Sequence, residues 1–165
     1  MDQEMMPGSN QTEGARSAPS RSLGHVVLNV SSLAVSTPFY CEVLGLKEVG
    51  RNSGARMVFL SFGINDHDIG LCESEPTVHR YYRSAVGLGH VAFLIGDRIE
   101  ELRSFKAHLE ARGIAIKRIV EYIAFTSIYF SDPDGIELEA YIEHPPETWR
   151  GKPQAERFAR PVRLD

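Results

Sequence analysis

The sequence lacks several features that define large classes of protein. It has only two cysteines, Cys41 and Cys72, so a disulfide framework is not expected. No apolar run approaches the roughly 20 residues that span a bilayer, and the polar N-terminus contains no apolar signal-peptide core. The net charge of −4 disfavours a nucleic-acid partner, which requires clustered positive charge. We therefore expect a cytoplasmic protein with no membrane or nucleic-acid partner.

Composition divides the chain into two polar ends and a patterned centre. Residues 1–21 are rich in Ser, Gly, Pro, Asn and Gln without apolar periodicity, which predicts a disordered tail. Residues 22–143 are predicted to form one domain. Residues 144–165 are a polar, proline-marked extension, in which Trp149 and Phe158 indicate packing on the domain or on a partner chain. A loosely ordered extension is the alternative.

One pattern of elements occurs twice within the central region. Each copy opens with the letters LGHV at the head of an apolar strand, continues with a helix and ends in three short strands. The first module, 22–75, holds a predicted strand 23–30, a helix 31–44 and strands 47–51, 56–62 and 67–73. The second module, 88–143, holds a strand 88–95, a helix capped by Asp97 and ended by Gly113, and strands 116–122, 125–130 and 136–142. The predicted fold class is α+β, with two βαβββ modules that bury a shared face.

The repeated histidines, His25 and His90, open corresponding strands. Strand alternation places both opposite the bulky residues that face each helix, and therefore on a concave face. Glu137 and Glu139 share that face in the last strand, and alternation does not separate them. Two imidazoles and one carboxylate form the facial triad of non-haem Fe(II) proteins, which leaves positions open for substrate and O2. A lone histidine at a strand start is usually an ordinary surface or core residue. The metal-site hypothesis therefore depends on the duplication, which brings two matching histidines together.

Five segments resemble, in order, the vicinal oxygen chelate superfamily: GHVVLNV, FYCEVLGL, FLSFGINDHDIGL, GLGHVAFLIGD and SIYFSDPDGIELEAY. The superfamily includes glyoxalase I, the fosfomycin- and bleomycin-resistance proteins and the type I extradiol dioxygenases. The resemblance covers residues 22–143 and implies paired modules around a metal cup. The implied metal ligands are His25, His90 and Glu139, since the family's carboxylate commonly lies four residues after the turn glycine, here Gly135. Glu137 is the fallback.

Within this superfamily the sequence most resembles single-pair extradiol dioxygenases, such as the enzymes that cleave L-DOPA. The resemblance implies acid–base catalysis by His67 in HDIGL and a contact of Tyr129 in SIYF with the substrate or oxygen. Related enzymes often carry a further histidine upstream, where this sequence has Tyr122. The implied activity is Fe(II)-dependent ring cleavage of a small catechol with O2, including an amino-acid-bearing catechol such as L-DOPA. Mn, Zn or Ni are alternative metals, and a homodimer is expected.

Several alternatives stay open. Glu73 or Glu75 lies where glyoxalase-type proteins carry a fourth ligand, and such a site implies a metal-dependent isomerase, lyase or thiol transferase. A metal-free small-molecule-binding resistance protein has the same fold. His67 is alternatively a solvated loop residue and Tyr129 a structural one. His79, between the modules, is a further candidate for a proton-transfer role.

Overall fold

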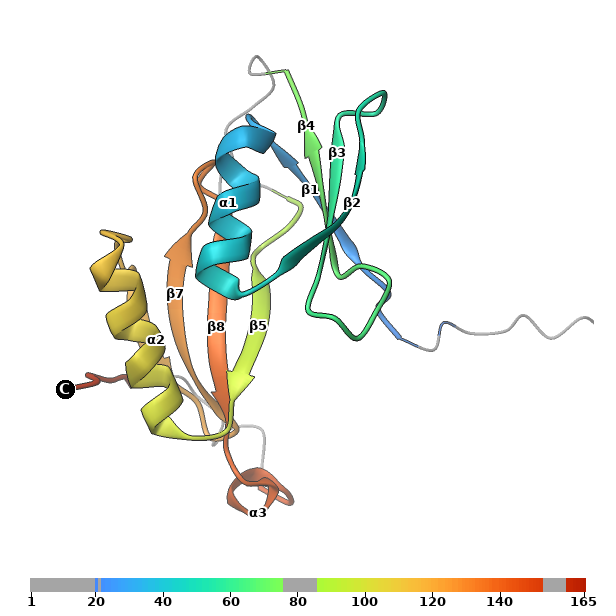
Figure 1. Cartoon of the computed structure of the whole chain (residues 1–165). Helices are drawn as coiled ribbons and strands as arrows, with labels where there is room; N and C mark the ends of the chain where they lie inside the picture. The colour runs from blue at the N-terminus through green and yellow to red at the C-terminus, as the bar shows by residue number, and fades with distance from the viewer. Residues whose placement is uncertain (1–19, 21, 76–85, 153–159) are drawn as a thin grey trace, which may run out of the picture.

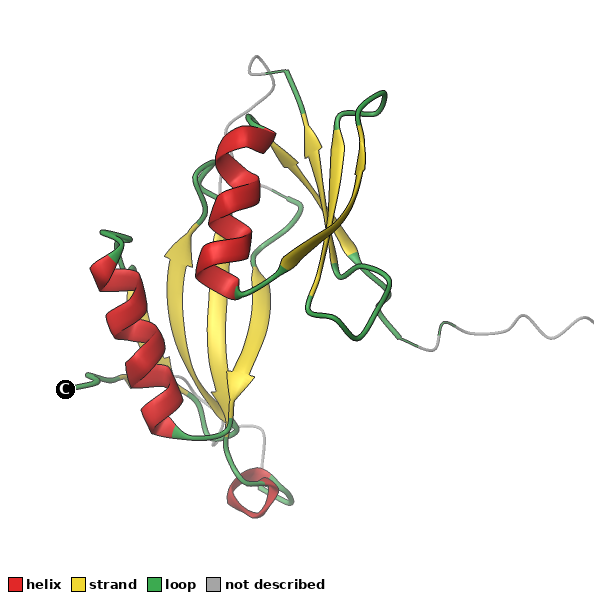
Figure 2. Cartoon of the chain, in the orientation of Figure 1, coloured by secondary structure: helices red, strands yellow, loops and turns green. Residues whose placement is uncertain are grey.

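The computed structural model describes residues 20, 22–75, 86–152 and 160–165. Within these ranges it contains two mixed β-sheets, each with one long helix packed on it (Figures 1 and 2). The first sheet has the order β1-β4-β3-β2 and comprises β1 (Val26–Val30), β2 (Lys47–Asn52), β3 (Met57–Ser61) and β4 (Ile69–Glu73). The second has the order β5-β8-β7-β6-β9 and comprises β5 (Val91–Gly96), β6 (Arg118–Glu121), β7 (Phe125–Ser131), β8 (Glu137–Glu143) and β9 (Arg160–Pro161).

The helices connect the strands in the order that the sequence pattern predicts. Helix α1 (Leu33–Leu44) packs on the first sheet, α2 (Ile99–Ala111) packs on the second, and a short α3 (Pro146–Trp149) follows β8. In each module the first and last strands pair in parallel, β1 with β4 and β5 with β8. The remaining neighbours are antiparallel. The prediction of paired βαβββ modules is confirmed, with element ends shifted by a few residues.

The face assignment from strand alternation also agrees with the structure. Leu28, Val30 and Phe93 are buried against the helices, whereas Val27 and Leu94 on the opposite faces are 46% and 55% exposed. The buried residues of both modules form one cluster. Burying a Leu- or Phe-sized side chain contributes about 1.5–3 kcal/mol, so this shared core stabilises both modules together.

The predicted start of the second helix is wrong by one residue. Arg98, not Asp97, is the N-cap of α2, and Glu101 completes the cap. One carboxylate oxygen of Glu101 accepts the backbone N–H groups of both Asp97 and Arg98 at 3.0 Å. A Cβ on Gly96 would collide with that carboxylate, so the glycine permits the longer reach.

The DPDG turn after β7 joins the modules. The Tyr40 hydroxyl in α1 donates to Asp132 Oδ2 at 3.0 Å, and the Ser31 N–H donates to Asp134 Oδ2 at 3.0 Å. Burial raises the pKa of Asp132 above its ordinary value. The other oxygen of Asp132 accepts the N–H of Ile136 at 2.7 Å, which closes the turn. The turn of one module thus holds the helix of the other.

The C-terminal extension adds structure to the second module. Strand β9 pairs antiparallel with β6, and Leu164 is buried. Residues 1–19, His79 and Phe158 lie outside the described residues, so the predictions for them are not tested. Within the described ranges, no helix is both long and apolar enough to cross a membrane.

Candidate metal centre

The second module brings His90 and Glu139 together. His90 Nε2 lies 2.9 Å from Glu139 Oε2. Glu139 is only 4% exposed, and its other oxygen accepts a hydrogen bond from the Ser127 hydroxyl on β7. A carboxylate this deeply buried requires donors or a cation. A hydroxyl and a titratable imidazole leave its negative charge available to a metal ion, so this pair fits a metal site.

Tyr129 and Tyr122 lie beside this pair. Tyr129 is 3% exposed, and its ring stands edge-on to His90 at 5.8 Å between centroids. Burial first, and then the hydrogen bonds with Tyr122 and Glu139, raise the pKa of Tyr129 above its ordinary value. The Tyr129 hydroxyl therefore keeps its proton at neutral pH and can donate a hydrogen bond in the site.

Arg118 on β6 was not predicted to belong to the site. Its guanidinium carbon lies 3.6 Å from the centroid of the Tyr129 ring. The same guanidinium donates two hydrogen bonds to Glu137, at 2.7 and 3.0 Å, and Lys117 Nζ lies 3.7 Å from that carboxylate. Glu137 is therefore occupied by cationic side chains of its own chain. Of the two glutamates that alternation leaves open, Glu139 is the one available to a metal.

The first module brings His25 and His67 together. Their ring centroids lie 4.3 Å apart, although strict alternation would place His67 on the other face. The reason is that His67 precedes β4 and lies in a loop, where alternation does not apply. Its side chain is 19% exposed and therefore partly buried. Asp66 Oδ2 lies 2.7 Å from His67 Nδ1, which leaves Nε2 for proton exchange when Nδ1 is the donor.

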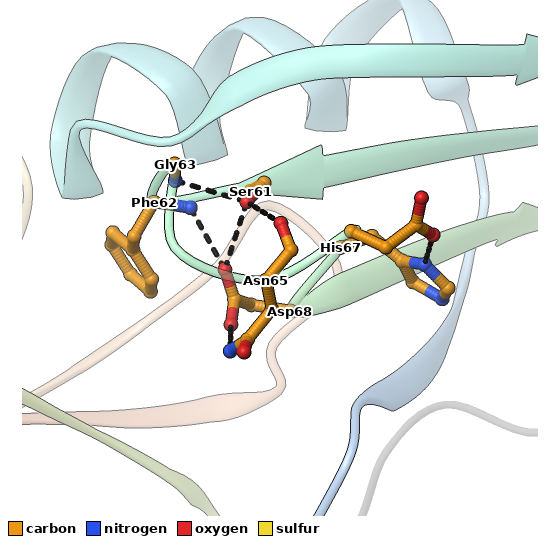
Figure 3. A network of polar contacts seen from close by, with 7 residues as sticks. Ser61, Phe62, Gly63, Asn65, His67 and Asp68 are labelled. Carbon is orange, nitrogen blue, oxygen red and sulfur yellow. Dashed lines mark hydrogen bonds and ion pairs between the residues drawn. The ribbon is translucent and has the colours of Figure 1, made fainter.

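A hydrogen-bonded network holds the loop that carries His67 (Figure 3). Asp68 accepts the Phe62 N–H at 2.8 Å and the Asn65 amide at 2.6 Å, and the Ser61 hydroxyl lies between Asp68 and the Asn65 carbonyl. These hydrogen bonds, that from Asn65 foremost, lower the pKa of Asp68 below its ordinary value. The loop is thereby fixed with the His67 imidazole against His25.

The duplicated register locates the fourth-ligand position in the first module. Ala92 pairs with Glu139 in the second module, and the corresponding Val27 pairs with Gly70 in the first. The position equivalent to Glu139 is therefore a glycine. Glu73 accepts the Leu33 N–H at 2.7 Å and pairs with Arg56, and Glu75 also pairs with Arg56 at 3.0 Å. Neither glutamate stands in the place that matches Glu139.

The two halves of the predicted site stay apart in one copy of the chain. Among the described residues, no three His, Cys, Asp or Glu side chains gather closely enough to hold a metal ion. The described residues of one chain therefore do not by themselves bring His25 to the His90–Glu139 pair. Val27 and Leu94, on strand faces opposite the helix-facing residues, are the exposed apolar residues noted above.

A cavity of about 320 Å³ adjoins Glu139. It lies on the face of the second sheet that carries the His90–Glu139 pair, and aromatic side chains form much of its wall. Its lining residues are Ala92, Ala124, Phe125, Glu139, Tyr141, Glu143 and Trp149. A volume of this size suits a small molecule.

Comparison with known proteins agrees with this architecture. Residues 22–140 match the model of the Glyoxalase/Bleomycin resistance protein/Dioxygenase superfamily. The chain belongs to this superfamily. Among the relatives of this superfamily member is the catechol-2,3-dioxygenase of Bacillus subtilis, 34% identical over 78% of this chain and 44% of that protein. The chain thus spans less than half the length of that dioxygenase.

Two further relatives show the breadth of the superfamily. The glutathione transferase FosA of Serratia marcescens is 32% identical over 74% of this chain and 81% of that protein. A glyoxylase/bleomycin resistance protein/dioxygenase domain from Frankia has a solved structure that superposes with a TM-score of 0.64. It is 26% identical and covers 76% of this chain and 99% of its own. Family membership therefore fixes the fold and leaves several chemistries open.

Proposed function

We propose that this protein is an Fe(II)-dependent extradiol dioxygenase that opens the ring of a small catechol, with an amino-acid-bearing catechol such as L-DOPA as a substrate. The observation that carries the proposal is Gly70 in the place that corresponds to Glu139. A site with two histidines and one carboxylate, and no fourth protein ligand, leaves coordination positions for both catechol oxygens and O2. The similarity to a catechol-2,3-dioxygenase supports the same reaction.

His25, His90 and Glu139 would hold the metal, and their donor atoms suit Fe(II), with Mn, Zn or Ni as alternatives. When bound, iron supplies binding positions for catechol and O2 together with the one-electron chemistry that O2 needs. The buried carboxylate of Glu139, bonded by Ser127, is fixed in orientation before any metal arrives. The protein therefore supplies geometry and proton transfer.

Proton transfer falls to side chains around this set. His67 Nε2 takes a proton from a catechol hydroxyl as the substrate binds and returns it to the product during ring opening, while Asp66 holds the opposite ring nitrogen. The Tyr129 hydroxyl donates to an oxygen of the substrate. Tyr122 lies near Tyr129 and would take the place of the histidine found in related enzymes. These roles are part of the proposal.

The site is proposed to form between two copies of the chain. His25 and His67 of one copy would face His90 and Glu139 of the other, because one copy alone keeps the two pairs apart. The exposed Val27 and Leu94 would be covered in the same contact. A C2 homodimer would contain two identical sites, each built from both chains.

Mixing two inactive variants tests this arrangement. His25→Ala and His90→Ala each disable every site in their own homodimer. A mixed dimer combines the intact His25 of one chain with the intact His90 of the other and therefore has one working site. After co-expression with random pairing, activity per chain should recover to about one quarter of the wild-type value. If the ligands came from one chain, no mixture would show activity above that of the separate variants.

The reaction is tested by metal analysis and oxygen uptake. Protein purified without air should contain about one iron per chain, and a panel of catechols should include one that consumes O2 in equal amount and gives a coloured ring-opened product. Zn or Ni with turnover of a glyoxalase substrate, or absence of O2 uptake with every catechol, would contradict the proposal.

A metal-dependent thiol transferase is the second candidate. It is favoured by the match to FosA, which extends over 81% of that protein. In such a reaction the metal acts as a Lewis acid and O2 is not consumed. The oxygen electrode therefore separates the two candidates directly.

A further inference from the structure

The cavity beside Glu139 runs along one face of β8. Glu139, Tyr141 and Glu143 alternate on that face and all three line the cavity. At about 3.3 Å per residue, the strand carries the cavity about 13 Å from the metal carboxylate to Glu143. This length exceeds what a catechol ring held at Glu139 would fill, so the far end is available to a substituent of the ring.

The far end has aromatic walls. Phe125 pairs with Glu143 in the β7–β8 register, and its ring stands edge-on to Tyr141 at 5.7 Å between centroids. Trp149 enters from α3, with its Nε1 donating to the His144 carbonyl at 3.3 Å. His144 is itself held, since its Nδ1 lies 3.1 Å from the Ile123 carbonyl. The wall is therefore anchored to the second sheet.

The charge in this cavity has one sign. Of the seven lining side chains only Glu139 and Glu143 are charged, and both are acidic. Aromatic faces next to a carboxylate attract an organic cation and repel an anion. Arg150 lies outside the lining, with its guanidinium carbon 5.7 Å from the centroid of the Trp149 ring, where the indole already contacts a cation. The chemistry complements an ammonium group on a short apolar chain.

We infer that this cavity selects catechols that carry a positively charged amine, with the ammonium at Glu143 and the connecting chain between Phe125, Tyr141 and Trp149. The inference rests on the proposed function, because the metal at Glu139 would hold the catechol oxygens at the other end. It assigns Glu143 and Trp149, which lie outside the metal set, the role of determining specificity.

The cavity can be tested without catalysis. Trp149 is the single tryptophan of the chain, so its fluorescence reports occupancy. The probes are phenethylamine, phenethyl alcohol and phenylacetate, which differ mainly in charge. Phenethylamine should bind about tenfold more tightly than the alcohol, and phenylacetate more weakly than either. Glu143→Gln should remove the preference for the amine, whereas Glu147→Gln on α3 should keep it. Equal binding of the three probes, or a preference that survives Glu143→Gln, would overturn the inference.

Turnover separates this inference from the proposed function. Dopamine should exceed 4-ethylcatechol in kcat/KM by about tenfold, and 3,4-dihydroxyphenylacetate should be poorest. Ring cleavage with equal kcat/KM for the three would overturn the inference and leave the function standing. Amine preference in the fluorescence titration, without O2 uptake on any catechol, would uphold the cavity and remove ring cleavage.

Discussion

The two modules share one backbone plan and differ in the chemistry placed on it. The first, 22–75, and the second, 88–143, pair their first and last strands in the same parallel register, and each opens with a histidine at the matching position. At the position where the second module has Glu139, the first has Gly70. The first module instead adds an imidazole, His67, from a loop. The two modules thus share one frame and differ in the side chains at single matching positions.

The modules also differ in how far their strands are buried. Strands β7 and β8 have seven residues each, nearly all buried or half-buried, whereas β2 is exposed almost throughout. Arg118, Tyr129, Glu137 and Glu139 form a connected polar floor in the second module. Glu139 therefore lies in buried strands of the second module, whereas β2 of the first module lies at the solvent-exposed edge of its sheet.

Removing the carboxylate of the second module should give the largest effect. Glu139→Ala should lose the metal and all measurable turnover, because two imidazoles alone leave the site without its anionic ligand. Glu137→Ala should keep the metal but lower the free energy of unfolding by about 2 kcal/mol, because Arg118 and Lys117 lose their partner. Metal analysis and urea denaturation of both variants measure this. Metal loss in the Glu137 variant alone would move the ligand to that residue.

Making the first module resemble the second should give the next largest effect. Gly70→Glu places a carboxylate at the position matching Glu139. Because this carboxylate would occupy one coordination position of the metal, O2-dependent turnover should fall more than about 100-fold while the metal is retained. Gly70→Ala is the matched control. Its Cβ would lie 3.2 Å from a Val27 methyl, a side chain that can adjust, so its activity should stay within a few-fold of wild type. Equal activity in both variants would contradict the proposal that Gly70 keeps a coordination position of the metal open.

Removing the loop imidazole of the first module should slow the reaction without emptying the site. His67→Ala should lower kcat about 100-fold, the usual contribution of one acid–base group, with unchanged metal content. Parallel measurements of iron per chain and of oxygen uptake check both halves of this expectation. A proportional loss of iron would instead make His67 a ligand.

The smallest effect concerns the loop that positions His67. Hydrogen bonds from Asn65, Phe62 and Ser61 lower the pKa of Asp68 from an ordinary value of 3.8. Asp68 therefore stabilises the fold above pH 3.8, and this stabilisation disappears as the pH falls through its lowered pKa. Asp68→Asn should be slightly less stable than wild type at neutral pH, and the difference should shrink in more acidic solution. Thermal unfolding across the acid range measures it, and a difference independent of pH would contradict the assignment.

Much of the fold could be predicted because short sequence patterns determine the strands and helices of both modules. The repeated LGHV, the alternation of apolar residues and the turn glycines placed every strand of both modules and the helix-facing residues. The cap of α2 was misplaced because Glu101 reaches back over Gly96, a contact that depends on the geometry of a β-strand end. Nothing local indicated that β9 would pair with β6.

The candidate site was only half accessible from the sequence. The family resemblance named His25, His90 and Glu139, but the choice against Glu137 depends on Arg118, which comes from another strand. The role of Gly70 needs the pairing register, and the contact of His67 with His25 depends on a loop where alternation fails. The separation of the two half-sites is a property of how the modules pack, which no single-strand pattern encodes.

The outer edge of β2 has a consequence for how copies of this protein meet. In the second sheet β9 covers β6, whereas in the described part of the chain no strand pairs with the outer edge of β2. That strand carries Lys47, Glu48 and Arg51 and is interrupted by a bulge between Glu48 and Gly50. Charges and a bulge on an open edge oppose strand-to-strand addition and the fibrous aggregates it produces. The β2 edge is therefore a poor surface for the contact between copies that is proposed above.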